Sequence, residues 1–363
     1  MGAAQSTVGI EWAYSNKRQS AYATATPNVD LDQSHPFEGA DMGEHTPNMS
    51  DNSAMYGKGH EFATRNQPLS WDSMFRRTFQ ATSKIAGWAW AFHLGNVTTS
   101  SLGGAPTAYR HTMTYQDHDG TGYYGSGRQQ PVVTIMEKIS SGVVRRFPSM
   151  QVKAVEISGQ INDWLRLGVE LQGSGAMNRV EPVSGYTFPD QASTEGALLR
   201  FAGVTFEHGV SGSTSDISCD VRSFRFRSEY QYFEADGYCP GSGYLISGNP
   251  DSGQVRNKLE FARRASVLEF VINLGTDDTL LDRLEQGTEL STIITCDGAT
   301  ISGANPHRQR ITVPRLKYRA VPISTDGDRV TMQVQAVLFY DSALNAPFEV
   351  VVQNTTTAYL ASS

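Results

Sequence analysis

Two stretches of the chain repeat one pattern of paired strands, and this repeat constrains the fold more than any other feature. Residues 148–175 read PSMQVKAVEISGQINDWLRLGVELQGSG, and residues 314–342 read PRLKYRAVPISTDGDRVTMQVQAVLFYDS. An offset of 314 − 148 = 166 residues aligns the two opening prolines and also Met150 with Leu316. Beyond the turn the second copy is one residue longer. The later arms then align Leu165, Leu167, Val169 and Leu171 with Met332, Val334, Ala336 and Leu338. Apolar residues at every second position predict strands with one buried face, so a duplicated domain is favoured over chance similarity.

Each copy also contains a turn signal and one change of phase. The dipeptide Asp326-Gly327 predicts a tight hairpin turn in the second copy, and residues 158–160 (Ser-Gly-Gln) predict a weaker turn in the first. The alternation shifts after Ala154 and after Ala320, as it does at a β-bulge.

Length and composition set the domain organisation and the fold class. A chain of 363 residues is expected to form two domains of about 150 to 200 residues. We place them at residues 1–185, with an extended N-terminal arm, and at residues 186–363, with the turn-rich stretch 173–200 around the boundary. Only 18% of the residues are charged. The abundance of Gly, Ser and Thr favours a mainly β fold with minor α.

One notable helix is predicted in each half. Met74, Phe75, Thr78, Phe79, Thr82 and Ala86 have helical spacing after a possible cap at Ser70, whereas residues 88–94 alternate like a strand. The second helix is predicted at residues 277–287, which end in Gly287. Strands are predicted at residues 107–116, 131–139, 198–209, 217–233, 266–275, 291–296, 310–323, 329–340 and 347–354.

The sequence predicts no enzyme, no cofactor and no metal site. Residues 120–125 (GTGYYG) satisfy G-x-G-x-x-G, but a strand follows them where phosphate binding needs a helix. Residues 117–122 (DHDGTG) resemble the start of a calcium loop, but Arg128 stands where a glutamate belongs. The three cysteines lack metal or redox spacing and are expected to be reduced and mostly packed. The net charge of −7 is shared by both halves, which excludes a basic nucleic-acid-binding module.

The order of these segments resembles the tail tube, or major tail, proteins of long-tailed bacteriophages. The resemblance rests on GIEWAYSNKRQSAYATATP near the start, then WAFHLG, YRHTMTY, PVVTIMEK and the first hairpin, and in the second half on the second hairpin and TLLDRLEQG. It implies two tandem tube-like β-sandwich or β-barrel domains, where one domain is common in the family.

The resemblance also implies a function. Subunits would form rings that stack into a tube, a conduit through which DNA passes without specific binding. Two domains per chain imply homotrimeric rings with pseudo-sixfold symmetry. The expected partners are copies of the chain, a tape measure protein and tail terminator or distal tail proteins, in the virion tail and, before assembly, in the host cytoplasm. Assembly contacts between rings are expected from the Gly-rich loop, at Tyr123, Tyr124 and Arg128.

Two other function classes fit the same composition. A virion-surface or extracellular β-sandwich that binds carbohydrate explains the strands, the aromatics and the low charge. A soluble enzyme is the third class, although no catalytic motif supports it.

Overall fold

The structure is a computed structural model that describes residues 10–22, 25–38, 42–51, 66–117, 122–125, 127–140, 143–180, 187–190, 197–232, 237–239, 243–247, 249–273, 279–326 and 329–362. These residues form 18 strands, two α-helices and three short 3-10 helices. The prediction of a mainly β chain with minor α is therefore confirmed. Neither described helix is long and apolar enough to span a bilayer.

The elements of the first half are β1 (Glu11–Ala13), η1 (Asn28–Asp30), β2 (Glu44–Asp51), β3 (Asn66–Gln80), α1 (Ser83–Leu94), β4 (Gly95–Gly103), β5 (Ala108–Tyr115), β6 (Val133–Ser140), β7 (Val143–Gln160), β8 (Arg166–Gln172) and β9 (Asn178–Val180). Those of the second half are η2 (Phe201–Gly203), β10 (Val204–Val210), β11 (Ser213–Asp216), β12 (Val221–Tyr232), η3 (Pro250–Ser252), β13 (Phe261–Asn273), α3 (Thr279–Glu285), β14 (Leu290–Ser302), β15 (Asn305–Ala320), β16 (Ile323–Asp326), β17 (Arg329–Leu338) and β18 (Glu349–Asn354).

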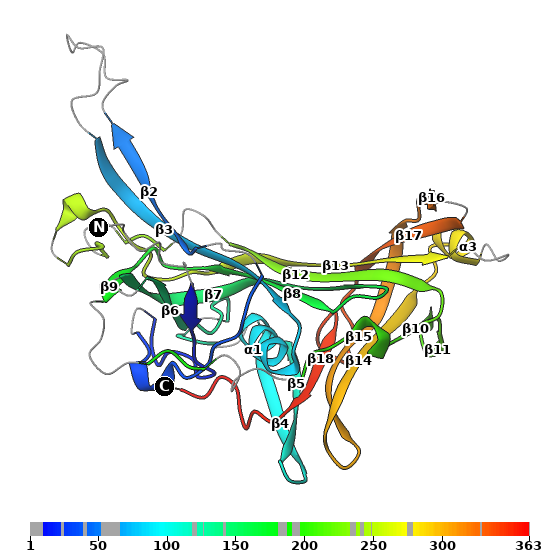
Figure 1. Cartoon of the computed structure of the whole chain (residues 1–363). Coiled ribbons are helices and arrows are strands. Elements are labelled where there is room, and N and C mark those ends of the chain that lie inside the picture. Colours follow the sequence, from blue (N-terminus) through cyan, green and yellow to red (C-terminus); the bar gives the residue numbers. More distant parts are fainter. Residues whose placement is uncertain are drawn as a thin grey trace, which may run out of the picture.

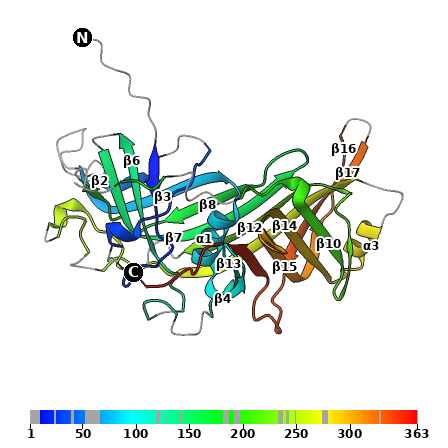
Figure 2. The same ribbon diagram turned by 60° about the horizontal axis from the view of Figure 1, so that its bottom comes forward.

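One long antiparallel sheet runs through both halves of the chain in the order β2-β3-β8-β7-β12-β13-β17-β16. The β2–β3 hairpin projects from one end of this sheet and β16 and β17 lie at the other end (Figures 1 and 2). The first part of β7 pairs with β6 and β9 in a second sheet. Strand β7 therefore passes from that second sheet into the long sheet.

The strand pairings of the first half recur in the second half. The pairs β1–β6, β6–β7, β7–β9, β7–β8, β8–β3 and β3–β2 have the counterparts β10–β14, β14–β15, β15–β18, β15/β16–β17, β17–β13 and β13–β12. The helices also correspond, because α1 follows β3 and α3 follows β13. Among the described elements, the hairpin of β4 and β5 has no counterpart in the second set, and β11 has none in the first.

The bulges fall at equivalent positions in the two sets. The register of β7 against β8 shifts between Val152 and Ala154, and that of β15 against β17 shifts between Tyr318 and Ala320, which are the same positions at the offset of 166. Bulges are therefore present as predicted, one residue earlier than the phase of the sequence indicated. The extra residue is Lys153 in the first set and Arg319 in the second.

The returning strands correspond with a shift from the sequence alignment. Ile157 pairs with Leu167, and its counterpart Ile323 pairs with Met332, so Leu167 and not Leu165 corresponds to Met332. The difference is two residues, which keeps the buried face unchanged because side chains alternate with a period of two. The first turn is also later than predicted, since β7 continues to Gln160.

The helix predicted after Ser70 is wrong over most of its length. Residues 66–80 form β3, and α1 begins at Ser83 after the cap Thr82, whose Oγ1 accepts a hydrogen bond from the N–H of Ile85. The inward face of β3 includes Arg77, and this buried cation hid the alternation. The strand predicted over residues 88–94 is also wrong. Helix α1 is buried on all sides except at Lys84, so its apolar residues show no helical period.

The other predicted elements are confirmed. Each of the nine predicted strand segments contains a strand, and residues 277–287 contain α3. Gly287 takes a φ of +60° just after that helix, as expected of a stop signal. Residues 277–278, the expected start of α3, lie outside the described residues, as do residues 118–121 of the calcium-like segment.

Both ends of the described chain pack onto the first half. Residues 10–22 and 25–38 contribute to the core, with Trp12 and Tyr14 buried, whereas much of the predicted N-terminal arm lies outside the described residues. Near the C-terminus the N–H of Leu360 donates to the carbonyl of Asn16 at 2.9 Å. The cysteines are free, but only Cys296 is buried, whereas Cys219 and Cys239 are exposed in connecting segments.

Candidate assembly interface

The two halves of the chain meet along two strand pairs, β5 with β18 and, within the long sheet, β7 with β12. The β7–β12 pairing is antiparallel and runs from Gln160 opposite Ser223 to Ala154 opposite Glu229. The N–H of Ile161 extends it by donating to the carbonyl of Arg222 at 3.0 Å. One half thus continues the sheet of the other through backbone hydrogen bonds.

Paired charges cover the exposed face of this junction. Arg225 donates to Glu156 at 2.7 Å and to Glu269 at 3.4 Å, so it joins β12 to both neighbouring strands. Arg227 reaches Glu170 at 3.2 Å on β8. The hydrogen bond that Arg225 donates to Glu156 raises the pKa of Arg225. Because these side chains are a quarter to half exposed, each pair contributes roughly 1 kcal/mol or less, and their main effect is to favour one register.

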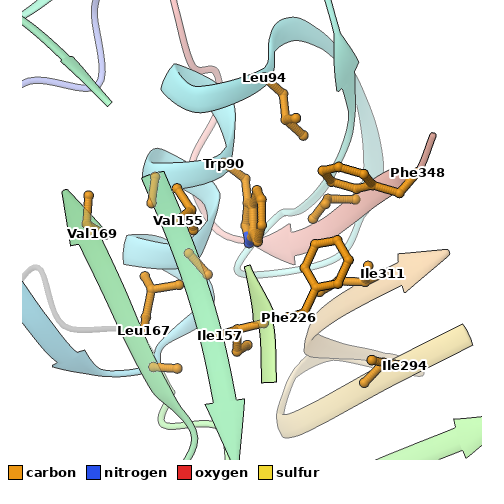
Figure 3. Close-up of a cluster of buried hydrophobic side chains, with 14 of the residues drawn as sticks. Trp90, Leu94, Val155, Ile157, Leu167, Val169, Phe226, Ile294, Ile311 and Phe348 are labelled. Carbon is orange, nitrogen blue, oxygen red and sulfur yellow. The ribbon is translucent and has the colours of Figure 1, made fainter. Parts of the chain in front are cut away.

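The opposite face of the junction is an aromatic core. Phe226 of β12 packs against Trp90 of α1 with ring centroids 5.9 Å apart, and against Phe348 at 4.9 Å. Figure 3 shows these rings converging with Val155 and Ile157 of β7. Each fully buried aromatic contributes roughly 1.5–3 kcal/mol through burial. Phe224, Phe226 and Tyr230 are buried on this face of β12, whereas Arg225 and Arg227 lie on the other face.

The long sheet has one unpaired edge at each end among the described strands. Strand β2 pairs only with β3. At the other end β14 covers β15 as far as Leu316, after which Lys317–Ala320 and β16 pair only with β17. We call these segments the β2 edge (Gly43–Asp51) and the β16 edge (Lys317–Asp326). Unpaired edges are sites where a further strand can bind.

Exposed apolar side chains gather beside these two edges. Of the large hydrophobic residues that are exposed in the described part of the chain, eight lie towards the ends of the sheet: Met42, Met49 and Leu69 at one end, and Ile323, Val330, Val337, Phe339 and Tyr340 at the other. Groups of exposed apolar side chains mark interaction surfaces.

Two side chains form hydrogen bonds with the backbone of Gly43, at the start of the β2 edge. The N–H of Gly43 donates to Glu137 at 3.0 Å, and its carbonyl accepts from Arg145 at 2.9 Å. Glu137 is fully buried and also pairs with Arg77 at 2.7 Å. Side chains therefore satisfy the backbone of Gly43 within the single chain, which protects the start of this edge.

The three residues expected to contact neighbouring rings lie in one segment beside α1. The hydroxyl of Tyr123 donates to the carbonyl of Gly95 at 2.6 Å, and that of Tyr124 donates to the carbonyl of Gln19 at 2.9 Å. Arg128 is exposed, and its carbonyl accepts from the N–H of Phe261 at 3.2 Å. Both tyrosines thus contact their own chain, and the role of all three in assembly stays a prediction.

A cavity of about 1080 Å³ opens on the charged face next to the junction. Lys153, Glu170, Arg227 and Glu229 line it together with Tyr238. Charges of both signs alternate along this wall, so they compensate one another. Within the described part of the chain, no three His, Cys, Asp or Glu side chains are grouped to hold a metal ion.

The edges, rather than the residues singled out in the sequence, are the main candidate site. Sequence reasoning missed them because an edge is defined by which strands do not pair. A scan against protein-family models found no match for this chain, and a search of curated proteins found no significant match.

Proposed function

We propose that this chain is a structural protein of a phage tail, and that it polymerises into stacked rings that form the tail tube. In this proposal residues 1–185 and 186–363 are two tandem tail-tube-like domains of the β-sandwich or β-barrel type. The tube serves as the conduit for DNA ejection. A tape measure protein and tail terminator or distal tail proteins are the proposed partners, in the virion tail.

The β7–β12 junction is the observation that carries this proposal. One set of strands continues the sheet of the other through this pair, while among the described strands the outermost strand of each set is unpaired at the ends of the long sheet. A sheet that continues from one set to the next closes into a barrel once enough sets are joined. Closure removes the exposed edges, which are otherwise sites of uncontrolled association.

The charges of the exposed face are compatible with a conduit. Arg225 and Arg227 are each paired with glutamates, and the chain as a whole has a net charge of −7. A lining of unpaired basic residues would bind DNA by counterion release and slow its passage. Paired charges avoid this effect.

Negative-stain electron microscopy of the purified chain over a range of concentrations tests the proposal. We expect rings or tubes that become more frequent as the concentration rises. A chain that stays monomeric throughout and binds a defined glycan would contradict the proposal and favour the carbohydrate-binding alternative.

A further inference from the structure

We propose that the β16 edge of one chain pairs antiparallel with the β2 edge of a second copy, with Ala320 opposite Thr46 of that copy. The inference rests on the proposed function and adds the surface and register through which copies join. It follows from the correspondence of strands, with the β7–β12 junction as the template.

The register is obtained in two steps. Ala154, at one end of the junction, corresponds to Ala320, because both directly follow the bulge and are 166 residues apart. Its partner Glu229 lies opposite Ala265 of β13. Strand β3 pairs with β8 in the same way as β13 pairs with β17. When the two pairs are superposed, Asp72 of β3 takes the position of Ala265, and Asp72 lies opposite Thr46. The Ala154–Glu229 pair thus becomes Ala320–Thr46 between chains.

Both edges are suited to this pairing. Pro47 follows Thr46 and has no N–H, so the pairing ends there, just as the template ends at Glu229. The β16 edge presents the exposed cations Lys317 and Arg319, whereas the β2 edge presents the exposed Glu44. This register places Lys317 and Arg319 just beyond the paired residues rather than opposite Glu44, so the opposite signs of the two edges favour a second copy of this chain as the occupant through longer-range attraction.

Apolar burial supports the same occupant. Ile323 is 51% exposed and would lie opposite Gly43 in this register, where the template has Ile157 opposite Phe226. Ile157 and Phe226 are both fully buried. In the single chain Glu137 and Arg145 bond the backbone of Gly43, so docking of the second copy replaces these side-chain hydrogen bonds with strand pairing.

A disulfide between chains tests the register. Because Ile161 and Arg222 form a hydrogen-bonded pair, alternation makes Ala154–Glu229 and its counterpart non-hydrogen-bonded pairs. Their Cα atoms lie about 4.5 Å apart, which suits a disulfide. In a background with Cys219→Ser and Cys239→Ser, we expect Ala320→Cys combined with Thr46→Cys to give covalently linked chains after mild oxidation of assembled rings.

Two matched variants control this experiment. Ala320→Cys with Asn48→Cys is displaced by two residues on the same face, so its yield of linked chains should be at least several-fold lower. Ala154→Cys with Glu229→Cys is the internal counterpart, and it should form its disulfide within one chain. Linkage at Asn48 equal to that at Thr46 would overturn the register.

Hydrogen exchange gives a second measurement that needs no substitution. The amides of residues 320–326 should exchange more slowly in rings than in the free chain. Rings that form without this protection and without linkage at Thr46 would overturn the inference and leave the tail-tube proposal intact. If no rings form under any condition, both fail.

Discussion

The buried imidazole of His93 connects α1 to both strands of the junction. Its Nδ1–H donates to the carbonyl of Val152 at 3.1 Å, which leaves Nε2 to accept from the hydroxyl of Ser228 at 2.8 Å. Burial lowers the pKa of His93 to about 3, with smaller contributions from Arg264 and Arg227. The ring is therefore neutral in the folded chain at neutral pH.

Acidification should destabilise the free chain through this residue. In the unfolded chain the pKa of a histidine is about 6.5, so below that pH only the unfolded state gains the proton. The free energy of unfolding should fall by about 2 kcal/mol between pH 7 and pH 5 on account of His93 alone. His35 and His208, with pKa values lowered to about 3 and about 4, act in the same direction.

Urea unfolding of the free chain at the two pH values measures this effect. The variant His93→Gln should lose about 2 kcal/mol less on acidification than the parent chain does, whatever its own stability at pH 7. An equal loss in both chains would show that His93 gains its proton in the folded state as well.

Single residues also explain where sequence reasoning failed. Arg77, Glu137 and Arg145 form a buried ionic cluster in the first half. The corresponding positions in the second half are apolar, among them Ile294 and Ile311. The cluster replaces the apolar positions of β3 and β7 with charges, so the pattern of the first half is harder to recognise. Pairing across the fold, which the sequence does not display, is what permits these charges inside.

At the scale of elements, alternation was a sufficient signal wherever a strand had one buried and one solvated face. β12 and β17 are of this kind, and both were predicted from their sequences. Helix α1 was misplaced because it is enclosed on every side by strands of both halves, and a fully buried helix has no polar face to set its period. The candidate edges were beyond prediction, since no residue pattern states which neighbour a strand lacks.

Variants in the segment that contains Tyr123, Tyr124 and Arg128 test whether it contributes to the stability of the fold, to assembly, or to both. Tyr124→Phe removes the bond to Gln19 and the acceptor for the N–H of Val132, so it should cost about 1 kcal/mol of unfolding free energy. We expect Arg128→Ala to shorten the tubes, if the segment contacts the next ring.

Tube length by electron microscopy and the unfolding midpoint by thermal denaturation separate the two effects. Tubes of normal length from Arg128→Ala would remove Arg128 from the proposed contacts between rings. A parallel loss of stability and length in both variants would indicate that the segment acts only through the fold.

At the scale of the whole molecule, the strand pairings of the first half recur in the second half, and under the tail-tube proposal this recurrence predicts how many chains a ring needs. Sequence analysis placed the repeat at one hairpin, whereas the structure extends the correspondence to six strand pairings and a helix. The halves nevertheless differ at their ends. One side of each set is joined to the other set within the chain, and the other side is an unpaired edge among the described strands. The internal junction and a junction between chains would therefore involve different strands.

Three chains should therefore close each ring. The resemblance to tail tube proteins implies six domains around the bore, and two sets of strands per chain give 6 ÷ 2 = 3 chains with pseudo-sixfold symmetry. The junctions then alternate between β7–β12 within a chain and the β16 edge with the β2 edge between chains, which lets the two contacts diverge in sequence. Native mass spectrometry of isolated rings should give 3 × 39.7 = 119.1 kDa. A mass of 6 × 39.7 = 238.2 kDa would mean that only one half of each chain lines the tube and that the other half decorates its surface.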